Sequence, residues 1–152
     1  MKADKISVFV EIVSALFIVL FVYAALTKLF DFQKFTVELG KSPILNVYSK
    51  QIAIAIPVLE VIISLFLAVK RFQFLTLYAA FTLMVIFSAY IVAILKFSAY
   101  VPCSCGGILQ NMTWKQHLVF NISFVLIAAT AILIYPSNKE DLIRDKKGRP
   151  HP

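Results

Sequence analysis

Four long apolar segments limit what this chain can fold into. They run from Ile6 to Phe30, from Ile52 to Val69, from Phe74 to Leu95 and from Trp114 to Tyr135. The hydrocarbon core of a bilayer is about 30 Å thick and a helix rises about 1.5 Å per residue, so about 20 apolar residues cross it. With 61% hydrophobic and only 15% charged residues, the composition excludes an ordinary soluble domain. The sequence therefore predicts an all-α membrane protein, an antiparallel bundle of four transmembrane helices.

The residues between the first two apolar segments predict a short interfacial helix in the first outer loop. Phe32, Phe35 and Leu39 recur at helical spacing, and the residues between them include charged and amide side chains. An amphipathic helix of this kind lies along the membrane surface. Gly40 is expected to end it.

The charges at the ends of the apolar segments predict the orientation in the membrane. Pro136 is expected to stop the last helix, so that 1–136 form the four-helix transmembrane domain and 137–152 a polar cytoplasmic tail. The side with both termini and the tight Lys70-Arg71 turn carries nine Lys and Arg residues, against six on the other side. The positive-inside rule then favours both termini in the cytoplasm. No basic patch with interleaved aromatic residues points to nucleic acid, despite the net charge of +7.

Cys103 and Cys105 are the chain's two cysteines, and both lie in the loop before the fourth helix. A bond between them closes a very small ring, and strained disulfides are more easily reduced than structural ones. Gly106 and Gly107 allow the tight turn that such a ring needs. The predicted orientation places this loop outside the cytoplasm, where disulfides form and persist. The pattern favours redox exchange, with a static bridge, free thiols or metal ligation as alternatives.

Glu60 is a carboxylate near the middle of the second apolar segment, three residues after Pro57. Because a charge at this depth costs about 2.5 kcal/mol or more, Glu60 is expected to face the interior of the bundle. It is interpreted either as a proton-handling or ligand-binding group, or as a protonated side chain bonded to a neighbouring helix. At the end of the first helix, Lys28 and Asp31 are expected to form an ion pair at i,i+3 spacing.

His117 and Asn121 lie at i and i+4 on one face of the fourth helix, for which Thr113 is the predicted N-cap. The loop is short enough to bring the imidazole back to Cys105. A neighbouring protonated histidine lowers the pKa of a cysteine and raises the thiolate fraction that performs exchange. The alternative is an interface histidine whose hydrogen bonds are satisfied.

Three groups of residues together resemble the MauE branch of the DoxX-like membrane proteins, over most of the chain from Ile6 to Tyr135. They are Lys28-x-x-Asp31 with the following Phe32 and Phe35, Pro57-x-x-Glu60, and Cys103-Ser-Cys105-Gly-Gly107. The resemblance implies a bacterial inner-membrane protein of methylamine utilisation that supports disulfide formation or handling in a periplasmic client, alongside a thioredoxin-like partner. The DoxX relatives imply quinone-coupled redox chemistry. Family members often have an aromatic residue where Gly106 stands, so the resemblance does not define the client.

The leading hypothesis is that Cys103 and Cys105 exchange disulfides in trans with a periplasmic thioredoxin-like protein, as a thiol-disulfide oxidoreductase or electron-transfer component. One thiolate forms the mixed disulfide and the other resolves it, and the spacing leaves open which one attacks and in which direction electrons flow. His117 is assigned to the same catalytic group, and a quinone is expected near Glu60. Two alternatives are a non-catalytic accessory subunit of a membrane complex and a carrier of a soft metal bound by Cys103, Cys105 and His117.

Overall fold

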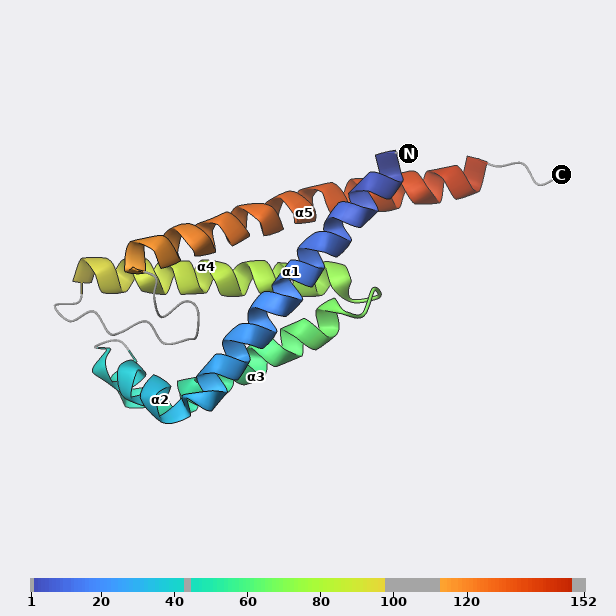
Figure 1. Ribbon diagram of the computed structural model, residues 1–152. Coiled ribbons are helices and arrows are strands. Elements are labelled where there is room, and N and C mark those ends of the chain that lie inside the picture. The colour runs from blue at the N-terminus through green and yellow to red at the C-terminus, as the bar shows by residue number, and fades with distance from the viewer. Residues whose placement is uncertain (1, 43–44, 98–112, 149–152) are drawn as a thin grey trace.

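The structure is a computed structural model that describes residues 2–42, 45–97 and 113–148. Side chains are described within these ranges for 5–42, 45–96 and 113–134. The helices in chain order are α1 (Lys2–Phe30), α2 (Phe32–Lys41), the 3-10 helix η1 (Asn46–Tyr48), α3 (Ser49–Leu67), α4 (Gln73–Phe97) and α5 (Trp114–Gly148) (Figure 1). Every element in the described part of the chain is helical.

Four of these segments are long and apolar enough to cross a membrane. They are Lys5–Phe30, Asn46–Leu67, Gln73–Lys96 and Trp114–Ile134. Their outward side chains are strongly apolar, as at Val19, which is 68% exposed. Such residues are stable in this position because lipid tails are as apolar as they are. The predicted bundle of four transmembrane helices is confirmed.

Side chains of α1, α3, α4 and α5 together form the core of the bundle. Phe17 and Phe21 of α1 are almost completely buried there, together with Leu77 of α4 and Ala128 of α5. The ring of Phe17 packs edge-on against Phe124, with ring centroids 5.3 Å apart and an interplanar angle of 88°. This T-shaped geometry is a favoured arrangement of aromatic pairs.

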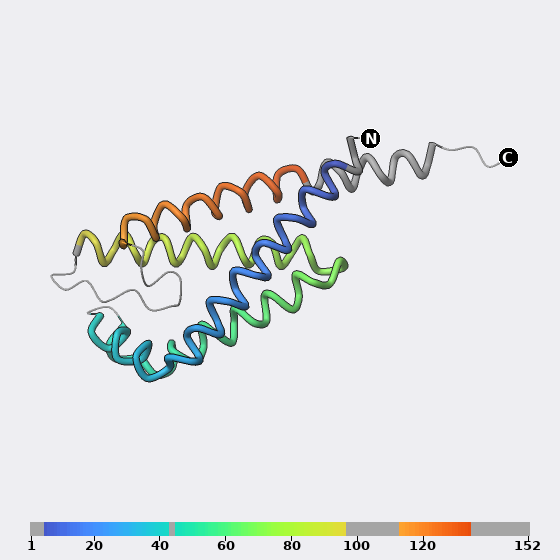
Figure 2. Tube along the Cα trace, viewed as in Figure 1, coloured from blue at the N-terminus to red at the C-terminus, as the bar shows by residue number. Residues whose placement is uncertain are grey.

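The four long helices differ in how extensively they contact one another. α1 packs along α3 and α5, and α4 packs along α5, whereas α3 and α4 contact each other over a shorter stretch. Figure 2 shows α3 and α4 close together at their connecting turn and diverging toward the end where α2 lies. The axes of α3 and α4 are therefore farther apart on the α2 side than at the turn.

The two ends of the molecule differ. The start of α1, the end of α5 and the turn between α3 and α4 lie at one end, while α2 and the chain ends that flank segment 98–112 lie at the other (Figure 1). At the first end, Lys70 donates a hydrogen bond to Glu11 of α1 over 2.7 Å, and this bond raises the pKa of Lys70. Glu11 therefore has a cationic partner.

α2 lies across the start of α3, as expected for an interfacial helix. Its Phe35 and Leu39 are buried against Ala53 and pack with Ile52 and Ile56 of α3. The helix includes Gly40 and ends one residue later. The amphipathic pattern thus predicted both the helix and its buried face.

One predicted boundary is wrong. Pro136 does not stop the last helix, since α5 continues to Gly148. A proline removes one backbone donor, but helices of membrane proteins tolerate it when nearby groups compensate. The polar residues that follow the last membrane span are therefore helical for most of their length.

Candidate functional site

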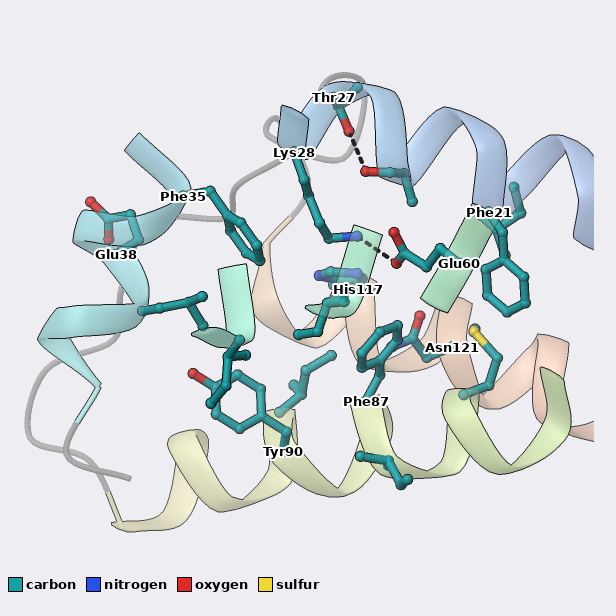
Figure 3. Close-up of a pocket in the computed structure, with 18 of the residues that line it drawn as sticks. Phe21, Thr27, Lys28, Phe35, Glu38, Glu60, Phe87, Tyr90, His117 and Asn121 are labelled. Atoms are coloured by element: carbon teal, nitrogen blue, oxygen red, sulfur yellow. Dashed lines mark hydrogen bonds and ion pairs between the residues drawn. The ribbon is translucent and has the colours of Figure 1, made fainter. Parts of the chain in front are cut away.

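A cavity of about 330 Å³ lies between the helices at the α2 end of the bundle. All five α-helices contribute side chains to its wall, and most of these side chains are apolar or aromatic. Figure 3 shows four of the polar side chains, Lys28, Glu60, His117 and Asn121, gathered together, while Glu38 and Tyr90 lie farther away. A mostly apolar cavity with a few convergent polar groups is the usual form of a small-molecule site.

An ion pair between α1 and α3 forms the polar centre of this cavity. Lys28 Nζ donates a hydrogen bond to Glu60 Oε1 over 2.6 Å, and the two side chains are 14% and 1% exposed. The ammonium also lies 5.8 Å from the centroid of the Phe87 ring, within the range of a cation–π interaction. Opposite charges held this close make both ions tolerable inside a membrane, where a single charge is costly.

The ion pair differs from the expected pair of Lys28 with Asp31 and agrees with the predicted inward position of Glu60. Lys28 pairs with Glu60 and not with Asp31, because packing of α1 along α3 brings a buried carboxylate to the lysine. The prediction that Glu60 faces the bundle interior is confirmed by its burial. Its other oxygen, Oε2, is buried and has no hydrogen-bond partner in the described part of the chain.

α5 brings His117 and Asn121 to the same cavity. The helix starts with a reciprocal cap: Gln116 N donates to Thr113 Oγ1 over 3.3 Å, and Thr113 N donates to Gln116 Oε1 over 2.9 Å. This capping box satisfies two donors at the helix start, and the predicted N-cap at Thr113 is confirmed. It sets the register in which His117 and Asn121, one turn apart, both line the cavity.

The imidazole of His117 has hydrogen-bonding capacity to offer a ligand. Its Nδ1 atom is buried and has no hydrogen-bond partner among the described residues. Its ring lies beside that of Trp114, with centroids 6.2 Å apart. An unpartnered buried polar atom costs free energy, so both Nδ1 of His117 and Oε2 of Glu60 would be stabilised by a bound molecule or water.

The predicted site residues fall into two groups. Glu60 and His117 line one cavity, which brings together residues from the second and fourth apolar segments. Cys103 and Cys105 lie outside the described residues, so the structure does not test their assignment. The metal-carrier hypothesis depends on the same cysteines. In the described ranges, no three His, Cys, Asp or Glu side chains gather as a metal site would require.

Sequence reasoning missed the part that Lys28 plays in this site. The sequence did contain a signal, since a buried glutamate in a membrane helix needs a nearby cation. Lys28 is the basic residue in the last turn of α1, which places it deep enough to reach across to α3. The i,i+3 spacing of Lys28 and Asp31 predicted a local pair, whereas the observed partner is 32 residues away in the sequence.

These features define a multi-pass α-helical membrane protein with a charged, mostly apolar pocket between its helices. Residues 6–134 match the family described as Methylamine utilisation protein MauE, and the chain belongs to this family. The resemblance read from the sequence is thereby confirmed. No curated protein and no solved structure is significantly similar to the chain.

Proposed function

We propose that this protein is a thiol-disulfide exchange protein of the bacterial inner membrane, acting through Cys103 and Cys105 on an extracytoplasmic client. Family membership supports a membrane protein of methylamine utilisation, and the client is proposed to be a disulfide-containing protein of that process or a thioredoxin-like intermediary. The Cys-x-Cys spacing supports exchange, because a strained small ring is readily opened by an attacking thiolate.

The described helix ends on either side of the cysteine segment support this proposal. The end of α4 and the start of α5 lie at the end of the bundle where the pocket lies (Figure 1). Trp114 and His117 of α5, which follow the cysteine segment in the sequence, line the pocket. In the sequence, both cysteines precede the helix that brings Trp114 and His117 to this buried polar site.

The proposed exchange conserves atoms and electrons between the two proteins. A client thiolate attacks the Cys103–Cys105 disulfide, joins one sulfur as a mixed disulfide and releases the other as a thiolate. The second client thiolate then attacks the mixed disulfide, so the client leaves oxidised and the pair remains as a dithiol. Two electrons have moved from the client to the pair. His117 is proposed to take up or supply a proton near the sulfurs.

The pocket fits a quinone as the electron acceptor that the family resemblance suggests. Its apolar and aromatic wall suits a flat ring, and Lys28, His117 and Asn121 offer polar groups to ring oxygens. Glu60, whose Oε2 has no partner in the described ranges, is proposed to contact the quinone at the same position. When bound, a quinone would supply an acceptor for two electrons and two protons. Lys28 and Glu60 would then hold protons beside it, since they already share one hydrogen bond.

Trapping of the mixed disulfide tests the proposal. Cys103→Ser and Cys105→Ser proteins are expressed separately in cells, and disulfide-linked partners are identified under non-reducing conditions. We expect one single variant to accumulate a mixed disulfide with an extracytoplasmic protein, and the double Cys103→Ser/Cys105→Ser control to accumulate none. If neither single variant traps a partner, or if the double variant still supports oxidation of the client, the proposal is wrong.

A further inference from the structure

The two carboxylate oxygens of Glu60 have different surroundings. Oε1 accepts the hydrogen bond from Lys28 Nζ over 2.6 Å, whereas Oε2 is buried and has no hydrogen-bond partner among the residues that the structure describes. The side chain is 1% exposed and lines the pocket. A buried acceptor without a donor costs free energy, and the cost is larger for a charged group. A ligand that donates a hydrogen bond to Oε2 therefore gains affinity that a ligand with acceptors alone cannot gain.

The ammonium of Lys28 supplies the complementary group beside this acceptor. A lysine ammonium carries three N–H donors and no acceptor, and Lys28 donates one of the three to Oε1 of Glu60. Because the two oxygens of a carboxylate are close together, one hydroxyl group beside the ion pair can donate to Oε2 and accept from Nζ. A carbonyl oxygen can only accept, so it leaves Oε2 without a donor. The ion pair therefore distinguishes a hydroxyl group from a carbonyl group.

His117 and Asn121 do not oppose this distinction. Figure 3 shows the imidazole of His117 beside the ion pair, with Asn121 close to it. A neutral imidazole nitrogen donates or accepts according to the tautomer, and an amide side chain offers both kinds of group. Either residue can therefore bind a hydroxyl or a carbonyl. In this cluster of four side chains the ionised carboxylate of Glu60 is the group that only accepts, so it decides which ligand is preferred.

We infer that the pocket binds the dihydroxy form of an aromatic redox ring, a hydroquinone, more tightly than the corresponding quinone, because a ring hydroxyl donates to Oε2 of Glu60. The inference rests on the proposed function, in which this pocket takes a quinone, and adds which redox form the pocket favours. Each tenfold preference for the reduced form raises the two-electron potential of the bound couple by about 30 mV. Glu60 would thus make a bound quinone a stronger acceptor of electrons.

Equilibrium dialysis measures the two affinities directly. Nanodiscs with the Cys103→Ser/Cys105→Ser protein, which serves as the reference, are dialysed against radiolabelled tetramethylbenzoquinone or against its hydroquinone, kept reduced without oxygen. Empty nanodiscs correct for partition into lipid, and the serines prevent electron exchange with the probe. Glu60→Gln in this background replaces the carboxylate by an amide, which can donate to a ring oxygen. Glu11→Gln is the matched control, because it removes the carboxylate of a lysine–glutamate pair at the opposite end of the bundle.

We expect the reference protein and Glu11→Gln to bind the hydroquinone about tenfold more tightly than the quinone, the value of a hydrogen bond to a charged group. In Glu60→Gln the preference should disappear or reverse. Equal binding of the two forms by the reference protein, or an unchanged preference in Glu60→Gln, would overturn the inference while the pocket remains a quinone site. Tighter binding of the quinone would mean that Oε2 carries a proton and would also overturn it. If neither form binds, the quinone pocket fails and the inference fails with it, whereas trapping of the mixed disulfide still decides the exchange proposal.

A second comparison needs no substitution. The protein with both cysteines is dialysed in the same way against the monomethyl ether and the dimethyl ether of hydroquinone. The monomethyl ether keeps one hydroxyl donor and should bind about tenfold more tightly than the dimethyl ether, which has none. Equal binding of the two ethers would overturn the inference, even where Glu60→Gln does not fold.

Discussion

Lys28 of α1 and Glu60 of α3 form an ion pair of 2.6 Å across the interior of the bundle, with the carboxylate almost fully buried. The pair joins the first two membrane-spanning helices at the wall of the pocket. Because Oε2 of Glu60 has no hydrogen-bond partner among the residues that the structure describes, the pair stabilises the fold and at the same time leaves an acceptor for a ligand. The charges of the pocket therefore serve both packing and the proposed chemistry.

Removing one member of this pair should destabilise the protein strongly. Lys28→Met leaves a buried carboxylate without its cation, and Glu60→Leu leaves a buried ammonium. Each is expected to lower the free energy of unfolding by about 3 kcal/mol. The double variant should recover most of this loss, since no unpaired charge remains. Unfolding of the purified proteins by sodium dodecyl sulfate in mixed micelles measures all three.

Lys50→Met is the control for loss of a lysine as such, because Lys50 is exposed at the start of α3. It should unfold like the unsubstituted protein. Losses that simply add in the double variant would contradict an interaction between Lys28 and Glu60.

Replacing His117 should weaken ligand binding without lowering the stability of the protein. Nδ1 of His117 is buried without a described partner, so His117→Leu removes an unsatisfied polar atom and should leave stability unchanged or raise it. The same change should weaken binding of a benzoquinone by about tenfold, the value of one lost hydrogen bond. Quenching of the fluorescence of Trp114, the single tryptophan of the chain, measures this binding. Val119→Ala, at a position of α5 that is 65% exposed, is the control and should change neither quantity. A His117→Leu protein that is destabilised but binds quinone normally would assign the histidine a purely structural part.

The membrane helices could be predicted because the physical requirement behind them is simple. A segment must be about 20 residues long and apolar to cross the bilayer, and hydropathy along the chain reports both properties. The inward position of Glu60 followed from the cost of exposing a carboxylate to lipid. The start of α5 followed from Thr113, the predicted N-cap.

The pairing of Lys28 and the shape of the pocket could not be predicted in the same way. Four apolar helices can be arranged as neighbours in several orders, and no local pattern says that α1 packs along α3. Asp31 was the nearest carboxylate in sequence, but Glu60 is the nearest in space. The separation of α3 and α4 toward the α2 end also arises from packing at a distance and had no signature in the sequence.

The pKa of Lys70 tests the ion pair between Lys70 and Glu11, which lies at the end of the molecule opposite the pocket. The hydrogen bond to Glu11 raises the pKa of Lys70 above its ordinary value of 10.5. A stabilising effect of this pair is then present in full below pH 10.5 and is lost as the pH rises through the raised pKa. Glu11→Gln removes the cause, so the pKa of Lys70 should fall.

Nuclear magnetic resonance of the carbon-13 dimethylated protein measures this change. Lys70→Arg identifies the Lys70 signal by its disappearance. The signal should titrate at a higher pH in the unsubstituted protein than in Glu11→Gln. Equal midpoints in the two proteins would mean that the two side chains do not interact in solution.

Accessibility of the cysteines to a membrane-impermeant maleimide tests the predicted orientation. In intact spheroplasts treated with a reductant, Cys103 and Cys105 should be labelled from outside, because the side with fewer Lys and Arg residues is expected to face away from the cytoplasm. The control carries Arg71→Cys in a Cys103→Ser/Cys105→Ser background, which puts a thiol in the turn at the opposite end of the bundle. It should react only after permeabilisation. The reverse labelling pattern would place Cys103 and Cys105 in the reducing cytosol, where a disulfide between them would not persist, and would remove the basis of the exchange proposal.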